Sequence, residues 1–174
     1  MAERILVLGG ARSGKSRFAQ QRAESRWPHP VYVATAEVGD AEMAARVKAH
    51  QQVRSDRWRT LEAPLEAPAA IRGGEGEADG FLMDCVTIWL SNVLLKEGES
   101  KVMGRQQELV AAFETAPRPV ILVSNEVGMS LVPEYPLGRL FRDLAGRLNQ
   151  DLAAVADTVV LVVAGLPWVL KGTL

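Results

Sequence analysis

Residues 9–16 read Gly-Gly-Ala-Arg-Ser-Gly-Lys-Ser, a glycine-rich stretch that ends in a lysine and a serine. Glycines allow the backbone to turn tightly with its N–H groups pointing inward, where they can bind phosphate oxygens. In this pattern Lys15 reaches the β- and γ-phosphates of a nucleoside triphosphate and the Ser16 hydroxyl binds Mg²⁺. The spacing therefore predicts a phosphate-binding P-loop for a purine nucleoside triphosphate, formed by Gly9, Gly10, Ala11, Arg12, Ser13, Gly14, Lys15 and Ser16.

A carboxylate for the metal is expected at the end of a neighbouring strand. Asp84 closes the apolar run Phe81-Leu82-Met83, which is typical of a buried strand. From that position Asp84 can hold Mg²⁺, directly or through water. The alternative is that it caps a helix beginning near Thr87.

Arg46, His50 and Arg54 are four residues apart, so a helix would place them on one face. Such a stripe is commonly a solvated basic surface. It could also bind phosphate while a neutral His50 attacks phosphorus and forms a phosphoramidate, with the arginines stabilising the charge. The other histidine, His29, lies between two prolines, a poor place for a nucleophile. The residues alone leave the role of His50 open.

Other polar residues near strand ends carry weaker signals. Glu62 could bind the hydroxyls or base of a nucleotide or cap a helix, and Glu126 could orient substrate or a metal-bound water or simply close a loop. Cys85, the single cysteine, lies among apolar residues and is expected to be a buried structural thiol. Trp89 and Leu90 are expected in the core.

The elements that must position these residues alternate between strands and helices. This alternation predicts an α/β fold, a mostly parallel sheet covered by helices on both faces, in a single domain over residues 1–174. Ligands of such sheets bind at the carboxyl ends of the strands. We expect strands at 5–8, 31–34, 81–84, 120–124 and 158–164, with a short antiparallel strand at 168–170. We expect helices at 15–26, 40–53, 62–72, 87–95, 102–115 and 137–156, and a loop at 73–80.

Composition excludes several other classes of protein. The formal net charge of −1 gives no basic field for nucleic acid, so no nucleic-acid partner is expected. A single cysteine cannot form an internal disulfide, which favours the reducing cytoplasm. No signal peptide is expected at the start of the chain, and no apolar run reaches the roughly 18 residues that a membrane span needs.

The motifs in order resemble the bifunctional adenosylcobinamide kinase / adenosylcobinamide-phosphate guanylyltransferase family of cobalamin biosynthesis. The P-loop is common to many enzymes, whereas its combination with the later segments is specific. The resemblance covers nearly the whole chain and is carried by residues 8–17, 32–36, 40–47, His50, Arg54, 58–62, 84–92, 124–129, 132–134 and 141–150.

The resemblance implies a RecA-like P-loop NTPase fold, a homotrimer and two reactions. ATP or GTP phosphorylates the aminopropanol hydroxyl of adenosylcobinamide, and GMP is then transferred from GTP to that phosphate through a guanylylated histidine, which matches His50. Beyond the P-loop, the resemblance implies GTP contacts at Ala34, Thr35, Ala36, Gln51, Gln52, Val53, Arg54, Glu62 and Asp84.

Two other functions remain as alternatives. A plain small-molecule kinase would need Lys15, Ser16 and Asp84 but not His50. A nucleotide-dependent switch that binds a protein partner would hydrolyse the triphosphate without any corrinoid.

Overall fold

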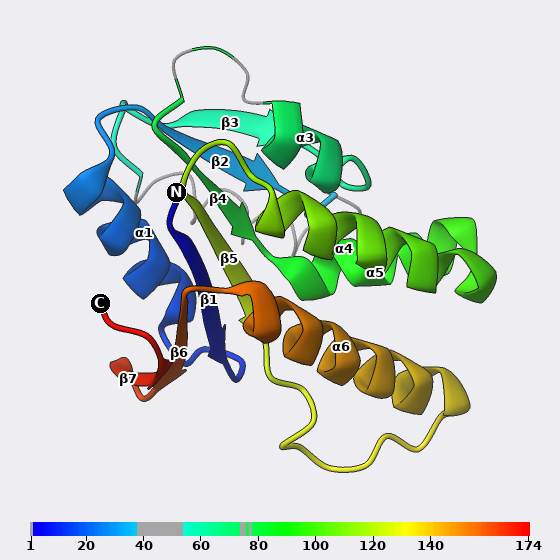
Figure 1. Cartoon of the computed structure of the whole chain (residues 1–174). Helices are drawn as coiled ribbons and strands as arrows, with labels where there is room; N and C mark the ends of the chain where they lie inside the picture. Colours follow the sequence, from blue (N-terminus) through cyan, green and yellow to red (C-terminus); the bar gives the residue numbers. More distant parts are fainter. Residues whose placement is uncertain (1, 38–53, 74–75, 77) are drawn as a thin grey trace.

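The computed structural model describes residues 2–37, 54–73, 76 and 78–174, and within these ranges a seven-stranded sheet carries helices on both faces (Figure 1). The elements in chain order are β1 (Arg4–Gly9), α1 (Lys15–Arg26), β2 (Pro30–Ala34), β3 (Arg59–Glu62), α3 (Ala67–Gly73), β4 (Gly80–Asp84), α4 (Val86–Glu97), α5 (Glu99–Glu114), β5 (Val120–Asn125), α6 (Pro136–Val155), β6 (Thr158–Val163) and β7 (Leu166–Lys171). The predicted α/β class is confirmed.

The strands lie in the order β3-β2-β4-β5-β1-β6-β7. All neighbouring pairs are parallel except β6 and β7, which are antiparallel, as predicted for the last strand. The carboxyl ends of six strands therefore meet at one edge of the sheet. The P-loop follows β1 at this edge, and Glu62, Asp84 and Asn125 are the last residues of their strands there.

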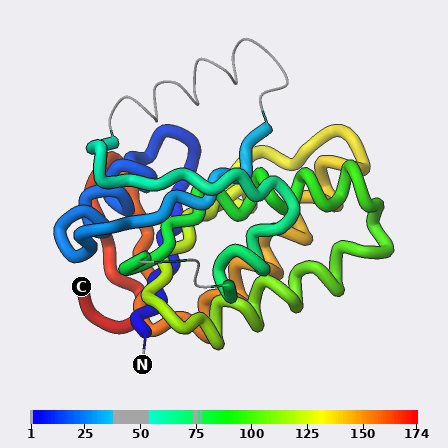
Figure 2. The backbone as a smooth tube through the Cα atoms, turned by 90° about the horizontal axis from the view of Figure 1, so that it is seen from above, coloured from blue at the N-terminus to red at the C-terminus, as the bar shows by residue number. Residues whose placement is uncertain are grey.

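Alternating residues of the strands supply two hydrophobic layers. On β1, Ile5 and Val7 pack on the face covered by α1, whereas Leu6 and Leu8 belong to the larger cluster on the opposite face. Figure 1 and, from above, Figure 2 both place α1 on one side of the sheet and α4, α5 and α6 on the other. The prediction of helices on both faces is thus confirmed, and Trp89 and Leu90 are fully buried in the larger cluster.

The predicted helix over 62–72 is wrong in its first half. Residues Arg59–Glu62 form β3, which pairs with β2 in the register Val33↔Leu61 and Ala34↔Glu62. The helix begins only at Ala67, with Pro68 in its first turn. A proline is tolerated in a first turn but not in a helix interior, which explains why Pro64 lies before the helix and not inside it.

The predicted helix over 40–53 lies outside the described residues. The other predicted helices are present, with ends shifted by a few residues. The helix predicted at 15–26 has those bounds. No helix in the described ranges has the length and apolar character needed to cross a bilayer.

Candidate active site

The loop between β1 and α1 has the geometry of a phosphate cradle. Gly14 has a φ of 97°, a conformation that favours glycine, and Arg12 has a φ of 56°. Ser13 N–H donates to Gly10 O at 3.3 Å, and Phe18 N–H donates to Gly14 O at 3.0 Å as α1 begins. The loop is tied to the sheet because Gly165 N–H donates to Ser13 O at 2.8 Å and Glu126 N–H donates to Gly9 O at 3.0 Å.

Lys15 is folded back over this loop. Its Nζ donates to Gly10 O at 3.0 Å, and only 8% of the residue is exposed. Burial lowers the pKa of Lys15, while the nearby Asp84 carboxylate and Cys85 oppose that shift. A buried ammonium at a glycine-rich loop that leads into a helix N-terminus is suited to binding phosphate oxygens.

Asp84 ends β4 at the same edge of the sheet as the P-loop. In the register of the sheet it lies opposite Ala34 on one side and Val123 on the other. The N-cap residue of α4 is Cys85 and not Asp84, which disfavours the helix-capping alternative. The Asp84 carboxylate opposes the lowering of the pKa of both Lys15 and Arg54 by burial, so its charge acts on both cations.

Buried hydrogen bonds fix the position of Thr35, the residue that follows β2. Thr35 is fully buried, and its hydroxyl bonds to both backbone groups of Cys85, at 2.9 Å each. Asn92 Nδ2 donates to Thr35 O at 2.8 Å. The Thr35 side chain therefore fixes the shape of the edge, whereas its neighbours Ala34 and Ala36 are partly exposed.

Arg54 reaches the same region from the segment that leads into β3. Its guanidinium carbon lies 3.8 Å from the ring centre of Tyr32, a cation–π contact, and its Nη1 donates to Thr60 at 3.1 Å. Burial and the Asp84 carboxylate raise the pKa of Tyr32 well above its usual range. The Trp58 and Tyr32 rings form a T-shaped pair, and Trp58 Nε1 donates to Glu24 at 2.6 Å, which anchors this segment on α1.

Glu62 is exposed at the end of β3, opposite Ala34. Glu62, Ala34 and Asp84 thus stand side by side on three adjacent strands. Gln51, Gln52, Val53 and His50 lie outside the described residues.

Glu126 follows β5 and closes its own loop, because its Oε1 accepts the Gly128 N–H at 2.9 Å. The loop hydrogen bond expected under the second interpretation of this residue is thus present. Cys85 is also as expected, since the thiol is buried and burial raises its pKa to about 11.

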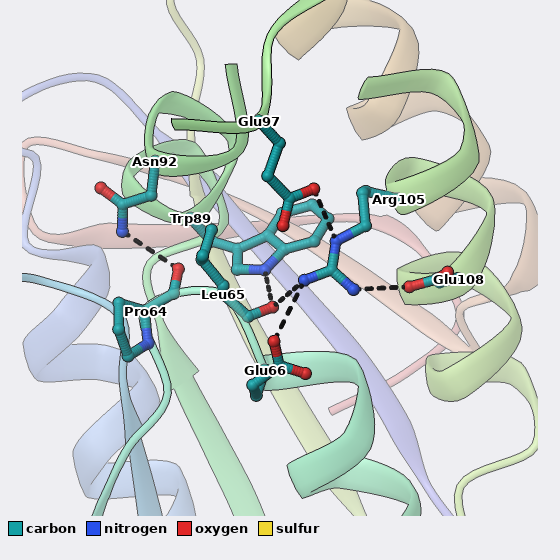
Figure 3. Close-up of polar contacts among 8 residues, drawn as sticks. All are labelled: Pro64, Leu65, Glu66, Trp89, Asn92, Glu97, Arg105 and Glu108. Carbon is teal, nitrogen blue, oxygen red and sulfur yellow. Dashed lines mark hydrogen bonds and ion pairs between the residues drawn. The ribbon is translucent and has the colours of Figure 1, made fainter. Parts of the chain in front are cut away.

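A second set of polar contacts connects α4 and α5 to the chain that follows β3. Arg105 of α5 and Trp89 of α4 both donate to Leu65 O, at 2.9 Å each, and Asn92 donates to Pro64 O at 3.0 Å (Figure 3). Arg105 also pairs with three carboxylates, those of Glu66, Glu97 and Glu108. This cluster fixes the chain directly after β3, and hence the position of Glu62.

Sequence reasoning did not single out Tyr32 and Thr87 as site residues, and it left Asn125 without a role. Asn125 Nδ2 donates to Thr87 Oγ1 at 2.7 Å, and the two residues line a cavity beside the P-loop. The available signal was that Asn125 ends β5 and that Thr87 lies in the first turn of α4, shortly after the end of β4.

Comparison with solved structures identifies the fold. The chain is similar to the RadB recombinase (TM-score 0.53, 14% identity, covering 91% of this chain and 73% of that one). It is also similar to the ATPase EscN of the type III secretion system of enteropathogenic E. coli (TM-score 0.56, 14% identity, 94% and 43%). At these identities the likeness supports a RecA-like P-loop NTPase fold and nothing finer.

Comparison of sequences is more specific. The chain is 43% identical to the bifunctional adenosylcobalamin biosynthesis protein CobP of Pseudomonas aeruginosa, over 97% of this chain and 98% of the relative. It is 42% identical to CobU of Salmonella typhimurium, a protein of the same description, over 93% and 96%. The profile of the CobU family matches residues 5–170. The chain therefore belongs to the cobinamide kinase / cobinamide phosphate guanyltransferase family.

Proposed function

We propose that this chain phosphorylates adenosylcobinamide with ATP or GTP and then transfers GMP from GTP to the adenosylcobinamide phosphate. The observation that carries the proposal is the buried Lys15 in the P-loop, electrostatically coupled to Asp84, in a chain that belongs to this family over nearly its full length. Family membership supplies the substrates, and the site supplies residues suited to phosphoryl chemistry.

In the first reaction the acceptor hydroxyl attacks the γ-phosphorus, and the bond from that phosphorus to the β,γ-bridging oxygen breaks. Lys15 and the backbone N–H groups of 9–16 hold the β- and γ-phosphates and stabilise the charge that develops on them. The hydroxyl proton passes to solvent or to a nearby base. The nucleoside diphosphate leaves.

A divalent cation fits this donor set. Among the described residues no group of three or more His, Cys, Asp or Glu could hold a metal ion alone. Mg²⁺, however, is usually bound by one or two protein oxygens together with phosphates and waters. Ser16 and Asp84 would supply those two oxygens, and the ion would neutralise phosphate charge.

In the second reaction we propose His50 as the nucleophile. Its imidazole nitrogen attacks the α-phosphorus of GTP, the bond to the pyrophosphate oxygen breaks, and a guanylylated histidine results. A phosphate oxygen of adenosylcobinamide phosphate then attacks the same phosphorus, and the P–N bond breaks to give adenosylcobinamide-GDP. Glu62, Arg54 and residues 34–36 are proposed to contact the nucleotide in this step, together with residues 51–53.

The histidine step is tested by incubation with GTP labelled at the α-phosphate. We expect label on the protein that is lost in acid and retained in base, as for a phosphoramidate. His50→Asn should abolish it. His29→Asn is a matched control, because His29 is the only other histidine and its contact with Asp79 is made by the backbone. Label that survives His50→Asn would refute the histidine step.

The kinase step is tested separately by product analysis with cobinamide and ATP. Lys15→Ala should fold and lose triphosphate use. A plain kinase would give phosphorylated cobinamide and no protein label. A nucleotide-dependent switch would hydrolyse triphosphate without using cobinamide.

The family resemblance also implies a homotrimer, which light scattering on the purified protein tests directly. A monomer in solution at working concentration would refute this part of the proposal and leave the chemistry unaffected.

A further inference from the structure

A cavity of about 450 Å³ opens beside the P-loop, between α4, the end of β5 and α6. Its lining includes Thr87, Ser91, Asn92, Asn125, Val127 and Phe141. None of these residues is among the contacts expected for the nucleotide. The cavity is therefore lined by residues other than those proposed to contact the nucleotide.

The cavity lies next to the phosphate cradle. Asn125 is paired with Gly9 in the register of β5 and β1, and the following residue, Glu126, donates its N–H to Gly9 O at 3.0 Å. On the other side, Thr87 Oγ1 lies 3.2 Å from Cys85 Sγ, directly after Asp84. A group bound against Asn125 and Thr87 is thus close to the loop that would hold the γ-phosphate.

The lining suits a neutral ligand. Among the described residues that line the cavity, the one charged side chain is Glu37, which forms an ion pair with Lys96, and none is a lysine or an arginine. A phosphate would therefore find no cation among these described side chains. The rest combines hydroxyl and carboxamide groups with the apolar side chains of Ile88, Val127 and Phe141. That combination fits a short chain that carries an alcohol and an amide on an aliphatic stem.

Some polar side chains that line the cavity can still form hydrogen bonds to a ligand. Asn125 donates through Nδ2 to Thr87 Oγ1, and Asn92 donates through Nδ2 to two backbone carbonyls. Within the described part of the chain, no hydrogen bond uses Asn125 Oδ1 or the Ser91 hydroxyl, so both are available to a ligand.

We propose that this cavity receives the hydroxyl-bearing amide arm of the acceptor, and that Asn125 and Ser91 bind it so that its hydroxyl faces the γ-phosphate. The volume suits such an arm and not a corrin macrocycle, which would remain outside the cavity mouth. This inference rests on the proposed function, because that function supplies the acceptor.

A blocking substitution tests the proposal. Ser91→Phe places a ring in the cavity, and Ser91→Leu is a milder variant should the first fail to fold. We expect either one to raise the KM for cobinamide about tenfold or more. The affinity for a fluorescent GTP analogue should change less than about twofold, because the P-loop is untouched. Ser100→Phe, at an exposed position of α5, is the control for a surface serine replaced by a large side chain.

The outcomes separate this inference from the proposed function. If the wild type phosphorylates cobinamide and both Ser91 variants, shown to be folded by thermal unfolding, keep its KM, the cavity assignment is overturned and the function stands. If the variants weaken nucleotide binding instead, the cavity belongs to the nucleotide and the assignment is again overturned. If the wild type neither binds nor phosphorylates cobinamide, the proposed function fails and the inference fails with it.

Discussion

Two adjacent glycines of the P-loop should respond very differently to alanine. A Cβ atom built on Gly9 would lie 2.7 Å from Val162 O of the neighbouring strand β6 and 2.4 Å from Ser13 Oγ. A Cβ atom built on Gly10 would meet no heavy atom of the described residues within 4 Å. The Ser13 hydroxyl can rotate away, but the Val162 carbonyl is part of the sheet and cannot move without disturbing β6.

The expected magnitudes follow from this geometry. Gly9→Ala overpacks a buried position and should lower the free energy of unfolding by about 1–3 kcal/mol. Gly10 does not have a left-handed φ, so Gly10→Ala is expected to be neutral or to stabilise by up to about 1 kcal/mol through the unfolded chain. The two variants should therefore differ by about 1–4 kcal/mol.

Urea unfolding followed by circular dichroism measures this difference, with equal slopes as the check that both variants unfold in the same way. Equal stability of the two variants would refute the close approach of β1 to β6. A second test adds Ser13→Ala to Gly9→Ala. The double variant should remain destabilised, and full recovery of stability would show that the clash involves the hydroxyl and not the backbone of Val162.

Three further predictions concern the scaffold. Cys85, whose pKa burial raises to about 11, should resist alkylation by iodoacetamide at pH 8 in the folded protein and react once urea unfolds it; rapid labelling of the folded protein would contradict its burial. Asp157→Asn should cost about 1 kcal/mol at pH 7, a modest value because the carboxylate is partly exposed. The hydrogen bond from Arg4 lowers the pKa of Asp157. The stability that the Asp157 carboxylate contributes is therefore present above the ordinary aspartate pKa near 4 and is lost as the pH falls below it. A stability difference between Asp157→Asn and wild type that persists at about pH 2 would contradict the role of the ion pair. Arg105→Met should lower the free energy of unfolding, measured with urea, by only about 1–2 kcal/mol, because Leu65 O keeps the hydrogen bond from the Trp89 indole (Figure 3). A loss above about 4 kcal/mol would show that the ion pairs of Arg105 dominate.

The sequence alone determined the P-loop, most of the elements and the family. A P-loop depends on residue types at fixed local spacing, and an amphipathic or buried segment shows its period within ten to twenty residues. The order of motifs along the chain then sufficed to recognise the family. Local patterns of this kind do not depend on the order of the strands in the sheet.

Tertiary structure decided what depends on neighbours distant in sequence. Arg59–Glu62 became a strand because β2 offers it a partner, and four residues are too few to show a period. The Arg54 guanidinium stacks on Tyr32, and the reason for glycine at position 9 is a carbonyl of β6. The cavity likewise exists only where α4, β5 and α6 meet, so no segment of the sequence could reveal it. Pairing, stacking and cavities are set by long-range packing, and that information is not present in any single stretch of the chain.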